Sequence, residues 1–151
     1  MRGCFASWLA VGLWGVSAVT GAVLFVRGQT EPAHDGRTAL VLSEQEAVFM
    51  LTEMRGMMGS VQGILKGLAS NDLRGIQDSA RASGAALGHG VPASLTVKLP
   101  LSFKEQGQAV HAGFDDLAVA ASQGETMSML TGRLATQLGR CVTCHATYRL
   151  R

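Results

Sequence analysis

Hydrophobic and polar residues alternate along most of this chain with the period of amphipathic helices. The clearest stretch begins at Ser43, which forms a capping box with Glu46 and so marks the start of a helix. Over about 25 residues the apolar positions then recur at spacings of three and four. They are Ala47, Met50, Met54, Met57, Val61, Ile64 and Leu68, with Leu51, Met58 and Leu65 widening the stripe. The pattern predicts one long helix with one apolar face.

Three further helices are predicted after this one. The second runs from Asp72 to about Leu87 and is weakly apolar, with inward positions at Leu73, Ile76, Ala80 and Leu87. A loop through Lys98 leads to the third, from about Leu101 to Ser122, whose inward positions are Phe103, Val110, Phe114, Leu117 and Ala121. The fourth runs from about Glu125 to Tyr148, with a stripe formed by Leu130, Leu134, Leu138 and Cys141.

The four segments together define the fold class. No stretch shows the alternation that is typical of a strand, and short loops join neighbouring helices. We therefore expect an all-α fold in which residues 43–151 form an antiparallel four-helix bundle.

The N-terminal segment has another pattern, because residues 4–26 contain no charged side chain. At 1.5 Å per residue this length makes about 35 Å of helix, enough to cross a hydrocarbon core of about 30 Å. Two interpretations stay open for residues 1–27: a signal peptide cleaved after a small-residue site near Ala22, or an uncleaved transmembrane anchor. Both export the rest of the chain. Residues 28–42 lack periodicity and are expected to be a tether.

Composition narrows the classes of function. A net charge of +2 over 151 residues, with no block of like charge, gives no reason to expect a nucleic-acid partner. No candidate general base, nucleophile or substrate pocket can be read from the sequence, so we do not expect an enzyme.

The sequence Cys141-Val-Thr-Cys144-His145 is the feature that narrows the function furthest. This C-x-x-C-H pattern is that of c-type haem attachment, in which both thiols add to the haem and the His ligates the iron. On a helix the three side chains share one face, because they fall at about 0°, 300° and 40° around the axis. Covalent attachment of one haem c also agrees with export, since c-type haem is attached outside the bacterial cytoplasm.

The sequence around the pentapeptide disfavours two other uses of it. A redox dithiol of the thioredoxin kind would follow a strand and open a helix, and no strand pattern precedes the motif. A structural zinc site needs four ligands, and the chain offers no second Cys or His pair at ligand spacing.

A haem-attachment motif on the last helix of a four-helix bundle resembles the cytochrome c-prime family and its low-spin relatives. Three further matches support the resemblance: Tyr148-Arg149 after the motif, Leu99 to Lys104 at the start of the third helix, and Lys66-Gly67 near the end of the first. The resemblance covers about residues 43–151. It implies a haem protein with His145 as the proximal iron ligand.

The resemblance also points to the opposite side of the iron. The family places an apolar side chain or a Met there, at a position that corresponds to Leu51, with Met50 and Met54 within one turn. We predict Met54 as the sixth ligand, in preference to Met50, while Leu51 over an open iron is the alternative. Most of the Met side chains in this helix are expected to fill the core.

Roles or positions are also predicted for two Arg and three His residues. Arg55 is a candidate partner for a haem propionate, as a basic residue of this helix is in relatives, and Arg149 is a candidate neighbour of the outer ring nitrogen of His145. We expect His111 to be a partly buried, hydrogen-bonded His, while His34 and His89 are expected in solvent.

The sequence therefore predicts a periplasmic c-type cytochrome that transfers electrons, held at the inner membrane by residues 4–26. The alternative is a five-coordinate haem protein that binds nitric oxide or carbon monoxide. The predicted partners are the haem, the membrane and redox proteins that the sequence does not specify, with a homodimer as a further option.

Overall fold

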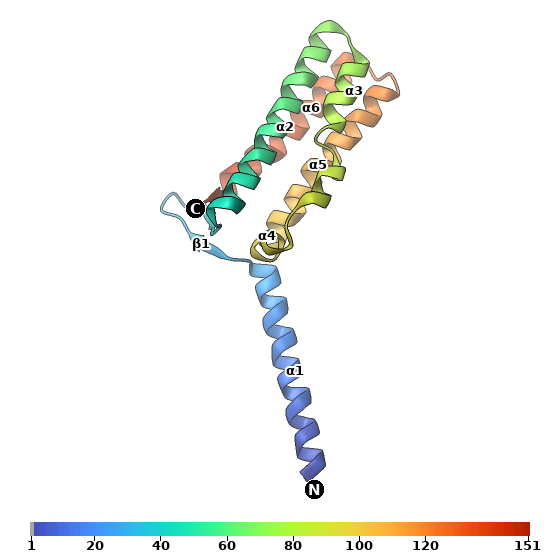
Figure 1. The fold of residues 1–151 in the computed structure, drawn as a ribbon. Coiled ribbons are helices and arrows are strands. Elements are labelled where there is room, and N and C mark those ends of the chain that lie inside the picture. Colours follow the sequence, from blue (N-terminus) through green and yellow to red (C-terminus); the bar gives the residue numbers. More distant parts are fainter. Residues whose placement is uncertain (1) are drawn as a thin grey trace.

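The computed structural model describes residues 2–151, except that the side chains of residues 2–7, 9, 10, 88 and 89 lie outside the description. The fold is mostly helical, with one small sheet (Figure 1). The helices are α1 (Arg2–Arg27), α2 (Glu44–Ser70), α3 (Leu73–Arg81), the 3-10 helix η1 (Ala85–Gly90), α4 (Ala93–Lys98), α5 (Leu101–Ser122) and α6 (Met127–Thr147). The strands are β1 (Thr30–Pro32), β2 (Thr38–Leu40) and β3 (Tyr148–Leu150).

Helices α2, α3, α5 and α6 lie side by side and make the body of the molecule (Figure 1). The predicted capping box starts α2: Ser43 accepts from the Glu46 amide, and Glu46 accepts from the Ser43 amide. Asn71, in the left-handed conformation, ends α2. The predicted inward positions of this helix are all buried or half-buried, whereas Leu51, Met58 and Leu65 are exposed.

Helix α5 has the bounds that the sequence predicts, and its five predicted inward residues are all buried. Helix α6 starts after Thr126, whose side chain accepts from the Met129 amide. The stripe of α6 differs by one residue from the prediction. Gln137 is 1% exposed and Leu138 is 37% exposed, because the Gln137 amide donates to the carbonyl oxygen of Val110 over 2.6 Å. The buried side of α6 therefore runs through Leu130, Leu134, Gln137, Cys141 and Cys144.

The predicted second helix is wrong in its length, since α3 ends at Arg81 and η1 follows. Two side chains of α5 bind the main-chain groups that a continuing helix would use: Asp115 accepts from the Ala85 amide, and His111 bonds to the carbonyl oxygen of Ser83. Leu87 is accordingly exposed.

The predicted loop through Lys98 contains a helix, α4. The amides of Leu95 and Thr96 both donate to the carbonyl oxygen of Pro92, which starts the helix. Leu95 is fully buried, so tertiary packing stabilises a helix of only six residues.

The expectation of no strand was wrong, and residues 28–42 are not a tether without structure. Strands β1 and β2 pair in antiparallel fashion on either side of Asp35-Gly36, and β2 pairs in parallel with β3, directly after the last helix. Ala39 and Leu40 are buried. Helix α6 stops at Thr147 because Tyr148 turns into this sheet, where its ring meets that of Phe103 edge-on at 5.2 Å.

Helix α1 projects away from the body (Figure 1). Among the described residues, no helix has both the length and the apolar character that crossing a membrane requires. The early part of the predicted segment 4–26 lies outside the described side chains.

Candidate cofactor site

The Cys-Val-Thr-Cys-His motif occupies the last two turns of α6, at the end of the body from which α1 emerges (Figure 1). Cys141 and Cys144 are half-buried free thiols, and the Cys141 thiol donates to the carbonyl oxygen of Gln137 over 3.7 Å. Cys144 packs against the buried residues of the body, whereas His145 is exposed. The two thiols thus lie along the inner side of α6, and the imidazole lies at its margin.

The thiols have the electrostatics of unreactive groups. Burial raises the pKa of Cys141, and burial together with the charge of Cys141 raises the pKa of Cys144. Reactive dithiols instead sit at a helix N-terminus, where the dipole lowers a thiol pKa. These cysteines lie at the C-terminal end of α6, so the site does not have the character of a thioredoxin-like centre.

The apolar core of the body is divided into two clusters. The upper cluster, far from α1, includes Ile64, Phe114 and Leu134, and Met57 packs against it. The lower cluster, near α1, is formed by Leu40, Leu95, Leu99, Phe103 and Tyr148, and Met50 and Cys144 pack against it.

Residues of α2, α6 and α5 lie between the two clusters. On α2, Met54 lies one turn from Met50 and about one turn from Met57; on α6, Cys141 lies between Leu134 and Cys144. Among the described side chains, neither Met54 nor Cys141 packs against either cluster. On α5, Val110 lies beside Gln137 of α6, so Gln106 and Gly107, one turn before Val110, lie about level with Cys141, one turn after Gln137. We call this level, together with Met54 on α2, the core break.

The core break contains a buried polar atom without a partner among the described residues. In the described part of the chain, the buried Oε1 atom of Gln106 has no hydrogen-bond partner, which is unusual for a buried acceptor. Gly107 is half-buried, and a methyl group added to it would meet no described atom within 4 Å outside the adjoining backbone of α5. Gln137, in contrast, is satisfied by Val110 and by the Arg140 guanidinium. A half-buried level with the Cys141 thiol and the Met54 thioether, and with the Cys144 thiol about one turn away on α6, has the chemistry to take a flat, largely apolar cofactor.

The remaining sequence-predicted residues are exposed or bonded elsewhere. Arg55 is exposed on α2, and Leu51 is 40% exposed on the same helix. Arg149 is not on the helix that carries His145 but on β3, where it forms an ion pair with Asp35 over 3.5 Å. His111 is partly buried and hydrogen-bonded, as predicted, His34 is exposed, and the His89 side chain lies outside the described residues.

A hairpin that the sequence reading missed covers the end of the motif. Arg37, in front of β2, donates to the carbonyl oxygen of His145 over 3.2 Å and pairs with Asp35 over 2.7 Å. The hydrogen bonds from Arg37, with a smaller contribution from the charge of Arg149, lower the pKa of Asp35 to about 2. The Asp-Gly pair at 35–36 is a hairpin signal, and Gly36 has the positive φ that such a turn needs.

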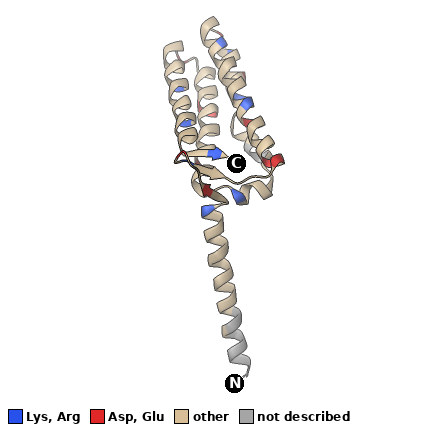
Figure 2. Cartoon of the chain, turned by 90° about the vertical axis from the view of Figure 1, so that its left-hand side faces the viewer, with Lys and Arg blue, Asp and Glu red and all other residues tan. Residues whose placement is uncertain are grey.

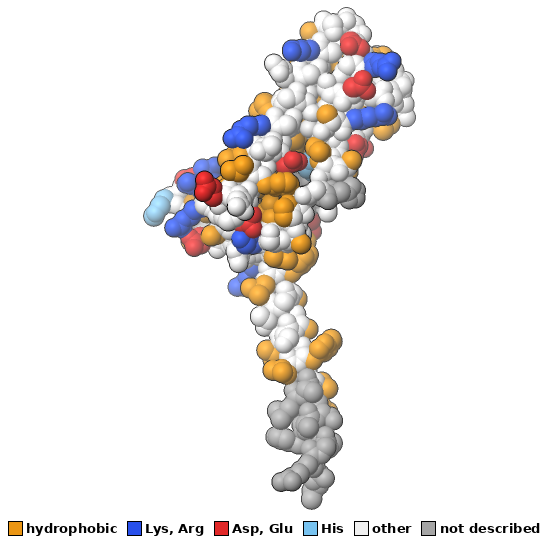
Figure 3. Space-filling view, in the orientation of Figure 1, with side chains coloured by type: hydrophobic (Ala, Val, Ile, Leu, Met, Phe, Trp, Pro, Cys, Tyr) orange, Lys and Arg blue, Asp and Glu red, His pale blue; other side chains and the backbone are white. Residues whose placement is uncertain are grey.

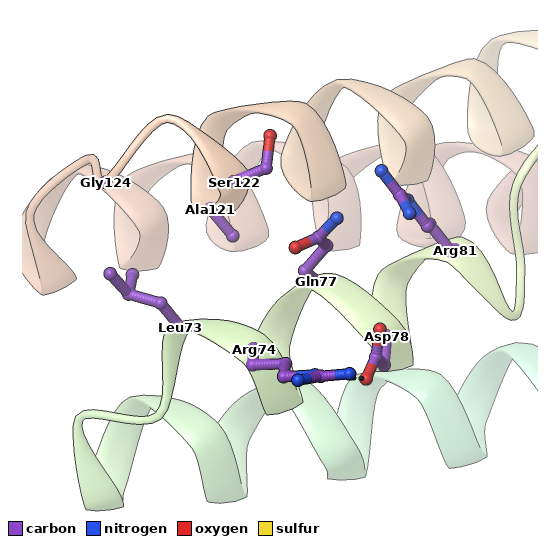
Figure 4. A pocket seen from close by; sticks show the side chains of 8 residues that line it. All are labelled: Leu73, Arg74, Gln77, Asp78, Arg81, Ala121, Ser122 and Gly124. Atoms are coloured by element: carbon purple, nitrogen blue, oxygen red, sulfur yellow. Dashed lines mark ion pairs between the residues drawn. The ribbon is translucent and has the colours of Figure 1, made fainter.

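Other candidate sites on the described surface are weaker. A pocket of about 460 Å³ lies at the opposite end of α6, lined by Leu73, Arg74, Gln77, Asp78, Arg81, Ala121, Ser122 and Gly124 (Figure 4). Arg74 faces Asp78 at 3.9 Å, so much of its charge is compensated. Across the described residues, no three His, Cys, Asp or Glu side chains gather in a way that could hold a metal ion.

Comparison with protein-family models, with curated proteins and with solved structures finds no match to this chain. Its function is therefore inferred from its own residues and their geometry.

Proposed function

We propose that this chain is a c-type cytochrome that carries one covalent haem on Cys141 and Cys144 and transfers electrons. The observation that carries the proposal is that both thiols of the C-x-x-C-H motif lie on the inner side of α6, at and beside the core break. Helices α2, α3, α5 and α6 would then act as an antiparallel four-helix bundle around the cofactor.

The roles of the residues follow from this placement. The two thiols hold the haem as thioethers, and His145 is the proximal ligand. The bound haem supplies one-electron chemistry at its iron. Burial raises the pKa of each thiol and so favours the neutral form of the pair further.

Met54 is the proposed sixth ligand. Met50 and Met57 are engaged by the lower and the upper cluster, whereas Met54 lies at the core break between them. A thioether ligand raises the reduction potential, which suits an electron carrier. Arg55, one residue further on the exposed side of α2, remains the proposed propionate partner.

A second function, the binding of nitric oxide or carbon monoxide, is favoured by one observation. Leu51 precedes Met54 by almost one turn and is an exposed apolar side chain, so the cofactor could bury it. If Leu51 covers the iron, the sixth position stays open and the protein binds gases.

We further propose that the protein acts in the periplasm, held at the inner membrane by residues 4–26. The support is the charge-free length of this segment and the need for c-type haem to be attached outside the cytoplasm.

An optical spectrum tests the proposal and separates the two functions. The chain is made together with a c-type haem maturation system, and the reduced protein is measured with and without carbon monoxide. The electron carrier predicts a low-spin spectrum that carbon monoxide leaves unchanged, and gas binding predicts a high-spin spectrum that shifts. A protein without haem absorbance contradicts both.

A further inference from the structure

The exit of α1 and the Cys-Val-Thr-Cys-His motif meet at one end of the body. Strand β1 begins three residues after α1, and β3 begins three residues after His145. Both strands pair with β2, so the three form one sheet at this end (Figure 1). Since neighbouring strands lie about 4.8 Å apart, β1 and β3 are separated by about 10 Å.

The junction between α1 and the body is fixed by specific contacts. Gly28 ends α1 with a φ of +63°, and a side chain there would collide with the carbonyl oxygen of Lys98. The next amide, that of Gln29, donates to this same oxygen over 2.7 Å.

Lys104 adds a second set of contacts at the junction. Its ammonium donates to the carbonyl oxygen of Phe25 over 3.2 Å and lies 3.5 Å from the centre of the Phe25 ring. The last turn of α1 is therefore held on α5 by a cation at its negative end. Together with the Gly28 contacts, this fixes the direction of α1 relative to the motif.

The described surface of α1 is apolar and exposed on every side, although no described helix has the length and apolar character that crossing a membrane requires. Four consecutive residues, Val23 to Val26, cover every side of the helix, and each is at least 44% exposed. The exposed apolar side chains continue along the described part as Trp8, Val11, Leu13, Trp14, Val16 and Val19. Arg27 follows directly, and basic and acidic positions lie close together where α1 meets the body (Figure 2). A helix that is apolar on all sides is typical of a protein core or of lipid.

Apolar side chains also gather at this end of the body, between α2 and α4 (Figure 3). Of the residues nearby, Leu51 and Val97 are exposed.

We infer that α1 holds the motif end of the body against the surface of a lipid bilayer, with the β1–β2 hairpin and β3 at the headgroups. One consequence rests on the proposed function: the protein that exchanges electrons with the haem is itself embedded in that bilayer. A carrier built to meet a diffusing partner would instead present its haem end away from the membrane.

Photo-crosslinking from lipid headgroups tests the placement without any readout of the haem. The full chain is placed in vesicles of phosphatidylethanolamine and phosphatidylglycerol in which some headgroups carry a diazirine. After illumination, the labelled peptides are identified by mass spectrometry. We expect label on residues 29–37 and 149–151 and at least several-fold less on the turns at 71–72 and 123–125, at the far end of the body.

A matched variant carries a Gly-Ser spacer of about twelve residues between Arg27 and Gly28, which reaches about 20 Å as a flexible coil. The spacer should lower the label on the hairpin several-fold and leave the membrane fraction unchanged. Three outcomes would each overturn the inference. The label could be equal at both ends of the body of the unaltered chain, the spacer could leave the pattern of label unchanged, or the chain could stay out of the membrane fraction. Failure of the proposed function is seen separately, as absence of covalent haem.

Discussion

The guanidinium of Arg37 donates a hydrogen bond to the main-chain carbonyl oxygen of His145, over 3.2 Å and across 108 residues of sequence. The same guanidinium is held by Asp35, which also pairs with Arg149. The segment that leaves α1 is thereby fastened to the proposed iron ligand and to the strand that follows it.

Substitution of Arg37 by Ala should increase local opening of the C-terminal strand. It should lower the global unfolding free energy only slightly, because exposed ion pairs contribute little to it. Hydrogen exchange should accelerate at the amides of Leu42 and Arg151, which bond β2 to β3. Exposed Arg74, whose Asp78 partner lies 3.9 Å away, is the control: Arg74→Ala should leave both amides unchanged.

The same contact predicts a pH dependence. Because the pKa of Asp35 is lowered to about 2 in the folded protein, its stabilising contribution is fully present above the ordinary value near 3.8. It is lost as the pH falls through about 2. Exchange at the Arg151 amide, corrected for its intrinsic rate, should therefore rise between about pH 4 and pH 2. Asp35→Asn should already show the faster exchange at about pH 4 and above, and the two proteins should converge toward about pH 2. An unchanged profile in Asp35→Asn would contradict the role of this carboxylate.

Gln137→Ala should lower the unfolding free energy by about 1 to 3 kcal/mol, since it removes a buried amide and leaves its partners unsatisfied. The partners are the carbonyl oxygen of Val110 and the guanidinium of Arg140. Leu138→Ala is the matched change one residue away and should cost less than about 1 kcal/mol. Denaturant unfolding measures both, and the reverse order would show that Leu138 faces the core.

Gly28→Ala should disturb the junction between α1 and the body. Alanine at a positive φ costs about 1 kcal/mol or more, and here its methyl group also meets the backbone at Lys98. Gly36→Ala separates the two effects, because Gly36 has a φ of +82° but open space around it. Limited proteolysis between α1 and β1 should increase strongly in Gly28→Ala and only slightly in Gly36→Ala. Equal cleavage of the two variants would mean that the close approach of Gly28 to the backbone at Lys98 has no effect on the junction.

Sequence periodicity predicted the long helices well and the connections poorly. The bounds of α5 follow from Pro100 and a continuous apolar stripe, and the start of α2 follows from its capping box. The end of α3 could not be predicted in this way, because Asp115 and His111 determine it from 30 and 28 residues away. The sheet was missed because its strands have three residues each, too short for a visible alternation.

The candidate site shows the same division. The motif was evident as a local pattern, and its thiols do lie on the inner side of α6. The inward position of Gln137 was not evident, since a polar residue on the buried stripe is recognisable only from its hydrogen bond to another helix. Arg149 was placed near His145 on the assumption that α6 continues, and the pairing of β3 with β2 prevents this.

The sixth iron ligand can be tested by three parallel substitutions. Met54→Ala should convert the low-spin spectrum to a high-spin one that carbon monoxide shifts. Met50→Ala and Met57→Ala should leave the spectrum unchanged. Each should lower the unfolding free energy by no more than about 5 kcal/mol, because each is a partly buried side chain that packs against a core cluster. A spectral change in Met50→Ala alone would reassign the ligand, and a high-spin unmutated protein would make gas binding the leading function.

Covalent attachment of haem at Cys141 and Cys144 is the central claim, and the intact mass of the denatured protein tests it most directly. Protein made with the maturation system should carry the added mass of one haem and keep its haem stain after extraction with acidified organic solvent. The variant Cys141→Ser with Cys144→Ser should lose both, while Cys4→Ser should keep them. A chain that releases all its haem into the solvent, or shows the mass of the polypeptide alone, would contradict the account.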